Sequence, residues 1–355
     1  MLNQQIEPLL VIFVLTSLAF IVSMVITPFF TTFLYKFKLG KKIRATGSTP
    51  VFSEMHKGKE GTPTMGGLLI WMTVLVLAFA SHYLFPIIAR LIGNKSIADF
   101  ITHLDFLSRS QTWLPLFCLV AVGILGAIDD LLNIKLGGGL RGRHKMLWLI
   151  LIGAIGAWWF YSKLGYDSIH VPGVGDFIIG FWYLPLFILV IVATANAVNL
   201  TDGLDGLAGG LLGSAFAAFA AIAYIQGNFG IAAFCGAIVG ALLSFLWFNI
   251  HPARFFMGDT GSLALGATLG VIAALLNSIL VLPIIGFIFV FETASVILQV
   301  FSKKVFKKKI FRSAPIHHHF QALGWPETKV TERFWVIGVV MAVIGLVIGL
   351  IGGGT

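Results

Sequence analysis

The sequence Phe229-Gly-Ile-Ala-Ala-Phe-Cys-Gly-Ala-Ile-Val-Gly-Ala-Leu-Leu-Ser-Phe-Leu-Trp-Phe248 runs for twenty residues without a charged side chain. A helix needs about 20 predominantly apolar residues to cross the hydrocarbon core of a bilayer, which is roughly 30 Å thick. The stretch therefore predicts a membrane-spanning helix. Nine further apolar stretches are visible on either side of it, at about 8–35, 66–91, 113–132, 146–162, 177–195, 206–225, 262–277, 279–302 and 334–353.

The composition of the whole chain agrees with a membrane protein. Hydrophobic residues make up 58% of the 355 residues and charged residues only 11%, against roughly 25% charged residues in soluble domains. We expect an all-α integral membrane protein, a single polytopic domain over residues 1–355 with about ten transmembrane helices. Cys118 and Cys235 stand alone, which excludes a disulfide framework or a zinc site of cysteine ligands. The first stretch is too long, and too basic at its far end, for a cleaved signal peptide.

The basic residues predict the orientation in the membrane. With both termini outside, the inner loops hold 20 of the 24 Lys and Arg residues, at 36–59, 135–145, Arg254 and 303–333. Basic residues are retained on the cytoplasmic side. The net charge of +9 is then explained by topology and by attraction to anionic membrane lipids, so we expect no nucleic-acid partner.

Five of the fifteen acidic residues stand at the ends of apolar stretches. They are Asp129, Asp130, Asp202, Asp205 and Asp259. The alternation of spans brings all five to the cytoplasmic face, where unpaired carboxylates at a membrane boundary are costly. An active site on that face is the leading hypothesis, and structural ion pairing is the alternative.

The local chemistry of these acids suggests a metal and a phosphate. Adjacent carboxylates on a helix, such as Asp129 and Asp130, point about 100° apart and so must have different roles. Asp205 and Asp259 lie in glycine-containing turns before helices, whose N-termini favour phosphate, although both could simply cap those helices. Oxygen ligands without thiols favour magnesium or manganese.

A third kind of motif is His317-His318-His319. Consecutive imidazoles do not suit one tetrahedral metal. Hydrogen-bond donors close to a phosphate-bearing substrate are the preferred interpretation, and a structural role is the alternative.

Five motifs together resemble those of the polyprenyl-phosphate hexose-1-phosphate transferases in order and spacing, over essentially the whole chain. The motifs are Gly61-Thr-Pro-Thr-Met-Gly-Gly67, Asp129-Asp130, Asn196-Ala-Val-Asn-Leu-Thr-Asp-Gly-Leu-Asp-Gly-Leu-Ala208, Phe256-Met-Gly-Asp-Thr-Gly-Ser-Leu-Ala-Leu-Gly266 and Pro315-Ile-His-His-His319. The triple histidine followed by Gly324-Trp-Pro-Glu327 is typical of the phospho-N-acetylmuramoyl-pentapeptide branch of that superfamily.

The resemblance implies an enzyme of the bacterial inner membrane that joins UDP-N-acetylmuramoyl-pentapeptide to undecaprenyl phosphate with the help of Mg²⁺, and it suggests a homodimer. It implies three catalytic residues: Asp259 as a magnesium ligand, Asp129 as the base that deprotonates the lipid phosphate, and Asp130. The substrate-binding residues that it implies are Lys59, Thr64, Lys145, Asn199, Asp202, Asp205, Asn249, Phe256, His317, His318 and His319, with Asn249 and Phe256 bordering the uridine.

Two departures from the family pattern and two alternative functions remain. Many relatives carry a lysine where this chain has Asn133, with Lys135 nearby, and a glutamate where it has Gln321. A sister transferase for UDP-N-acetylglucosamine is the first alternative function. A secondary transporter is the second, although only Glu292 falls within a span, whereas transporters place substrate sites near the bilayer midplane. Transfer in one step, or in two through a phospho-aspartate, both fit the sequence.

Overall fold

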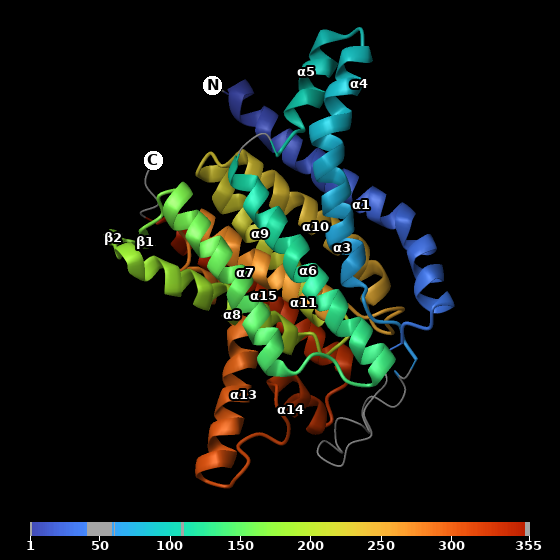
Figure 1. Cartoon of the computed structure of the whole chain (residues 1–355), viewed down its shortest axis with the longest axis vertical. Coiled ribbons are helices and arrows are strands. Elements are labelled where there is room, and N and C mark those ends of the chain that lie inside the picture. The colour runs from blue at the N-terminus through green and yellow to red at the C-terminus, as the bar shows by residue number, and fades with distance from the viewer. Residues whose placement is uncertain (1, 41–58, 60, 108–109, 352–355) are drawn as a thin grey trace.

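The computed structural model describes residues 2–40, 59, 61–107 and 110–351 of the chain. Several basic residues of the orientation argument, Lys41, Lys42, Arg44, Lys57 and Arg109, lie outside this range. The helices are α1 (Leu2–Lys36), α3 (Gly67–Phe79), α4 (Phe85–Leu91), α5 (Lys95–His103), α6 (Ser110–Leu136), α7 (Gly142–Lys163), α8 (Tyr183–Thr201), α9 (Leu207–Ile225), α10 (Phe229–Asn249), α11 (Asp259–Leu275), α12 (Leu282–Ile285), α13 (Phe287–Val305), α14 (Ile316–Ala322) and α15 (Glu327–Leu350) (Figure 1).

The prediction of an all-α membrane protein is confirmed, since each of the ten apolar stretches is largely helical. Within the described residues, eight helical segments are long and apolar enough to cross a membrane. Helix α11 has 17 residues and is shorter than the usual span, and α13 carries Glu292, Lys303 and Lys304. The number of ten crossings and the orientation stay predictions.

Helix α11 forms the centre of the bundle (Figure 1). It packs against α3, α6, α8 and α9, and every residue from Thr260 to Leu275 is buried. A helix that is apolar on all sides is one that is enclosed by other helices. Since Asp259 is the first residue of α11, the central helix fixes the position of this predicted catalytic carboxylate.

The described residues also form one small hairpin that the sequence analysis did not predict. Strands β1 (Ser168–Val171) and β2 (Gly175–Ile178) pair antiparallel, with Ser168 opposite Ile178. The predicted span at 177–195 began inside β2, whereas α8 begins at Tyr183. The hairpin lies near the C-terminal end of the chain (Figure 1), where Gly173 N–H donates to the Ile351 carbonyl at 3.3 Å.

Glycine allows a close helix contact at the site. A Cβ atom added to Gly126 of α6 would lie 2.2 Å from the Asp259 main-chain oxygen, so only glycine fits there. Small residues let helix backbones approach closely in membrane proteins. The contact brings the end of α6, with Asp129 and Asp130, next to the beginning of α11.

Candidate active site

Two carboxylates from different helices share one cation. Lys145, in the first turn of α7, lies 3.1 Å from Asp129 Oδ2 and also contacts Asp259 Oδ2. The Leu140 N–H donates to Asp129 Oδ1 at 2.5 Å. The Asn199 side-chain amide donates to Asp259 Oδ1 at 2.8 Å. We call Asp129, Lys145 and Asp259 the acidic centre.

Asp130 faces a different set of partners from its neighbour Asp129. Its carboxylate accepts hydrogen bonds from Thr260 N–H at 3.0 Å and Thr260 Oγ1 at 2.7 Å. It also accepts one from Asp259 N–H at 3.3 Å. It thereby caps the first turn of α11. The expectation that the two adjacent carboxylates point to different places is confirmed.

Gly258, directly before Asp259, is enclosed by predicted site residues. Its φ of 71° lies in the region that favours glycine. A Cβ atom there would lie 2.5 Å from both Thr64 Oγ1 and Asp130 Oδ2. Its N–H donates to Asp202 Oδ2 at 3.2 Å. Asp130 and Asp202 therefore hold the turn that presents Asp259, and Thr64 lies beside it.

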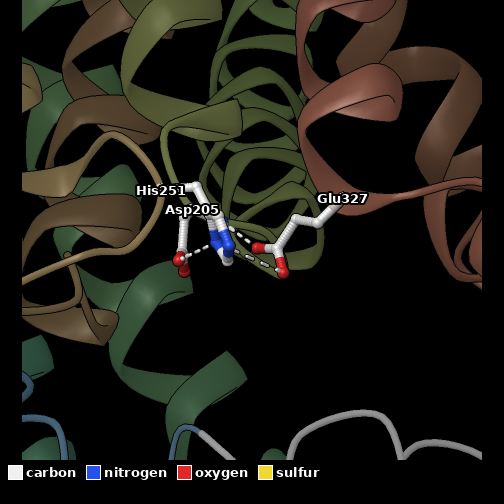
Figure 2. Close-up of side chains that lie close together, drawn as sticks. All are labelled: Asp205, His251 and Glu327. Carbon is white, nitrogen blue, oxygen red and sulfur yellow. Dashed lines mark hydrogen bonds and ion pairs between the residues drawn. The ribbon is translucent and has the colours of Figure 1, made fainter.

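A second cluster, the Lys59 cluster, consists of Lys59, Asp205, His251 and Glu327. Lys59 Nζ lies 2.7 Å from Asp205 Oδ1 and 2.5 Å from Glu327 Oε1. His251 Nδ1 lies 2.9 Å from Asp205 Oδ2. Figure 2 shows the Asp205, His251 and Glu327 side chains pointing toward one another. The cluster ties together four segments that are distant in sequence.

The Lys59 cluster has the same charge pattern as the acidic centre, with one lysine between two carboxylates. The ligand atoms of Asp205, His251 and Glu327 lie within 4.8 Å of one another, close enough for a cation. The Lys59 ammonium compensates both carboxylates. Burial raises the pKa of Asp205, but Lys59, the Ala253 N–H and His251 lower it more, and the resulting pKa lies below its ordinary value.

Asn249 and Phe256 border the Lys59 cluster. The Asn249 amide donates to the Phe255 carbonyl at 2.8 Å, and its oxygen accepts from Gly206 N–H at 3.0 Å. Lys59 Nζ lies 5.7 Å from the centre of the half-buried Phe256 ring. Both polar atoms of the Asn249 side chain are thus hydrogen-bonded to main-chain groups. Phe256 exposes part of its aromatic ring beside an ammonium group.

The three histidines lie in different environments. His317 is fully buried, and its Nδ1 lies 3.0 Å from Glu292 Oε2. His318 is buried too, with Nδ1 2.8 Å from Gln321 Oε1. His319 is half-buried, and its Nδ1 accepts from Arg312 N–H at 3.1 Å. His319 is the most accessible of the three in residue exposure.

The structure brings the predicted residues other than the three histidines into two groups. Thr64, Asn199 and Asp202 join the acidic centre with Asp130, while Asn249 and Phe256 join the Lys59 cluster. Sequence reasoning did not select His251, Glu327 or Glu292 as site residues. The signals existed, because Glu327 closes the Gly-Trp-Pro-Glu motif and Glu292 is an isolated acid within an apolar stretch.

The acidic centre suits a hard divalent cation. Asp129 and Asp259 provide carboxylate oxygens that already bind one common positive atom, Lys145 Nζ, and no thiol is among the donors. Hard cations take oxygen ligands of this type. The residues present therefore fit a metal ion, and Asp259, one of the two carboxylates, begins α11.

Comparisons with known proteins show which family this chain resembles. Residues 112–277 match the glycosyl transferase family 4 model, and residues 59–70 match signature 1 of the phospho-N-acetylmuramoyl-pentapeptide-transferases. A transferase of the latter name from Geobacillus sp. (strain WCH70) is 39% identical over 335 residues, which are 93% of this chain and 95% of that protein. One from Clostridium novyi (strain NT) is 40% identical over 92% of this chain and 93% of its own.

Proposed function

Since the chain belongs to the phospho-N-acetylmuramoyl-pentapeptide-transferase family, we propose that it transfers phospho-N-acetylmuramoyl-pentapeptide from its UDP conjugate to undecaprenyl phosphate. An oxygen of the lipid phosphate forms a bond to the β-phosphorus of the nucleotide. The bond from that phosphorus to the bridging oxygen breaks, and UMP leaves. The lipid product is the undecaprenyl-pyrophosphoryl sugar, lipid I.

The observation that carries the proposal is the acidic centre. Transfer between two anions depends on positioning and on stabilising charge at the phosphorus. Lys145 supplies a positive charge that is in place before substrate binds, beside Asp129 and Asp259. Asp259 is the proposed ligand of Mg²⁺, which when bound polarises the phosphoryl oxygens. Asp129 takes the proton of the lipid phosphate.

The neighbouring residues position these groups and the nucleotide. Asp130 and Asp202 hold the 258–260 turn by its main-chain N–H groups. Phe256, at the edge of the Lys59 cluster, offers an aromatic face for the base of the nucleotide, and Lys59, which pairs with Asp205 and Glu327, is proposed to lie beside the phosphates. His319, the most exposed of the histidines, is the one proposed to reach the substrate directly.

The location of the reaction follows from the substrates. A nucleotide sugar is water-soluble and undecaprenyl phosphate is a membrane lipid, so the two meet at a membrane boundary. The acidic residues stand at the ends of apolar helices. We propose the cytoplasmic face of the bacterial inner membrane, in agreement with the distribution of Lys and Arg.

The experiment is a comparison of nucleotide sugars. Purified protein receives Mg²⁺ and undecaprenyl phosphate, with UDP-N-acetylmuramoyl-pentapeptide or UDP-N-acetylglucosamine, and UMP release is measured. We expect UMP only with the muramoyl-pentapeptide conjugate and only when the lipid is present. UMP release with UDP-N-acetylglucosamine alone would instead assign the chain to the sister activity.

A further inference from the structure

Helix α13 has a polar stripe that faces inward. Glu292, Ser295, Gln299 and Ser302 are buried and follow one another at helical spacing. The opposite side of the helix exposes large apolar residues, among them Ile297, Val300 and Phe301. The helix is therefore apolar outward and polar inward. A buried polar stripe needs partners, because an unpaired polar group inside a protein is costly.

The partners come from the segment that follows the helix. Ser302 Oγ donates to the Lys308 carbonyl at 2.8 Å. Gln299 Oε1 accepts from Ile310 N–H and Phe311 N–H, each at 3.0 Å. Glu292 stands at the other end of the stripe, beyond Ser295, and pairs with His317. The stripe thus holds the 308–317 segment along its length, up to the first histidine of the triple motif.

The Glu292–His317 pair is the most deeply buried contact of the stripe. Both side chains have an exposed fraction of 0%, and Nδ1 lies 3.0 Å from Oε2. Removing one partner of a buried pair is strongly destabilising, whereas replacing both partners by well-packed apolar residues of similar volume often is not. A paired carboxylate at this depth is therefore expected to have a function that an apolar residue could not replace.

His317 connects this pair to the acidic centre. A Cβ atom added to Gly203 would lie 2.3 Å from His317 Nε2, so the imidazole is packed directly on the Gly203 backbone. Asp202, the preceding residue, accepts the hydrogen bond from Gly258 N–H at 3.2 Å. Gly258 in turn precedes Asp259. A continuous series of contacts leads from α13 to the proposed metal ligand.

We propose that Glu292 is a positioning residue for the transfer reaction. By pairing with His317 it holds the imidazole on Gly203, and so keeps Asp202 on the turn that presents Asp259. It touches no substrate itself, and the assignment rests on the proposed function. His317 would then affect the reaction without contacting the substrate, through its contact with the Gly203 backbone.

A double-mutant cycle separates positioning from stability alone. The variants are Glu292→Gln, His317→Asn and their combination, with the exposed Glu332→Gln on α15 as the matched control. We expect each single change to lower kcat by about 10-fold and the double change by about 10-fold too, because contacting residues that act as one unit are not additive. The melting temperature should fall in both single variants, because each leaves one buried side chain of the pair without the other.

The combined variant decides between the two explanations. If the pair only stabilises the fold, neutralising both partners should restore kcat together with the melting temperature. If Glu292 positions the site through His317, the melting temperature recovers while kcat stays low. A combined variant with the kcat of the wild type would overturn the proposal. So would a combined variant whose loss of kcat equals the product of the two single losses, about 100-fold.

Gly203→Ala tests the same connection should the Glu292 variants not fold. It leaves the buried pair intact and pushes on the imidazole from the other side, while Gly213→Ala, whose added Cβ meets nothing within 4 Å, is the control. We expect Gly203→Ala to lower kcat and to weaken the rise in melting temperature caused by Mg²⁺. The Mg²⁺ response needs no substrate, so it can be read even if the wild type released no UMP and the proposed function had failed. A kcat and a Mg²⁺ response equal to those of Gly213→Ala would contradict the connection.

Discussion

Asp129 and Asp259 lie on different helices and contact the same ammonium group, that of Lys145. The shared cation makes the two carboxylates look equivalent, but their surroundings differ. Asp259 also binds the Asn199 amide and begins the central helix, whereas Asp129 accepts the Leu140 N–H near the end of α6. The two residues should therefore respond differently to the same substitution.

Asp259→Asn removes the charge of the proposed metal ligand while keeping its shape. We expect nearly complete loss of UMP release, with any residual rate needing more Mg²⁺ than the wild type, because a neutral amide binds the cation less strongly. The measurement is the initial rate across a Mg²⁺ titration at saturating lipid. A variant with the wild-type rate and the wild-type Mg²⁺ dependence would remove Asp259 from the metal site.

Asp129→Asn should behave differently in the same titration. Its rate should fall by roughly 10²- to 10⁴-fold, the usual effect of removing a general base, while its Mg²⁺ dependence stays near that of the wild type. Raising the pH should partly restore the rate, because the second ionisation of a phosphate monoester lies near pH 6. A defect cured entirely by excess Mg²⁺ would make Asp129 a metal ligand instead.

Gly126→Ala tests the contact between α6 and α11. The added methyl group would meet the Asp259 main-chain oxygen at 2.2 Å, so the helices must separate, which costs about 1–3 kcal/mol for overpacking. We expect a lower melting temperature and a lower rate of transfer. Gly213→Ala in α9, with free space around it, should change neither. Equal melting temperatures for the two variants would show that the helices adapt without cost.

The sequence was enough to predict the all-α membrane fold and the acids near the ends of its apolar helices, because both follow from hydropathy and from the cost of charge in a bilayer. It could not show that Lys145 lies between Asp129 and Asp259, since that depends on how α6, α7 and α11 pack. The burial of His317 could not be predicted from the sequence either. Its partner Glu292 lies on a different helix, and no periodicity in the sequence links the two.

The lowered pKa of Asp205 predicts how stability depends on pH. A carboxyl group whose pKa is lower in the folded than in the unfolded state stabilises the fold above its unfolded pKa of about 3.9 and loses this contribution as the pH falls through the folded pKa. The difference in melting temperature between the wild type and Asp205→Asn should therefore be constant from pH 7 to 5 and should shrink below about pH 3.9. Both proteins should carry His251→Gln, so that the difference reports on Asp205 and not on its imidazole partner. A difference that changes between pH 7 and 5 in that background would contradict the assignment.

The orientation in the membrane can be tested with single cysteines. A cysteine at position 308, in the exposed segment between α13 and α14, should react with a membrane-impermeant maleimide only from the cytoplasmic side. A cysteine at position 163, at the C-terminal end of α7, should react with the maleimide only from outside. The native Cys118 and Cys235 are buried and should give little background. Labelling of position 308 from outside in intact cells would contradict the predicted orientation.

The most direct test of the transfer itself follows the phosphate. UDP-N-acetylmuramoyl-pentapeptide labelled with ³²P at the β-phosphorus is incubated with the protein, Mg²⁺ and undecaprenyl phosphate, and the lipid and aqueous fractions are then separated. If the sugar moves together with its phosphate, the label enters the lipid fraction in step with the release of unlabelled UMP. If the label stays in water as UDP while the sugar enters the lipid, the protein moves the sugar alone, and phosphosugar transfer is contradicted.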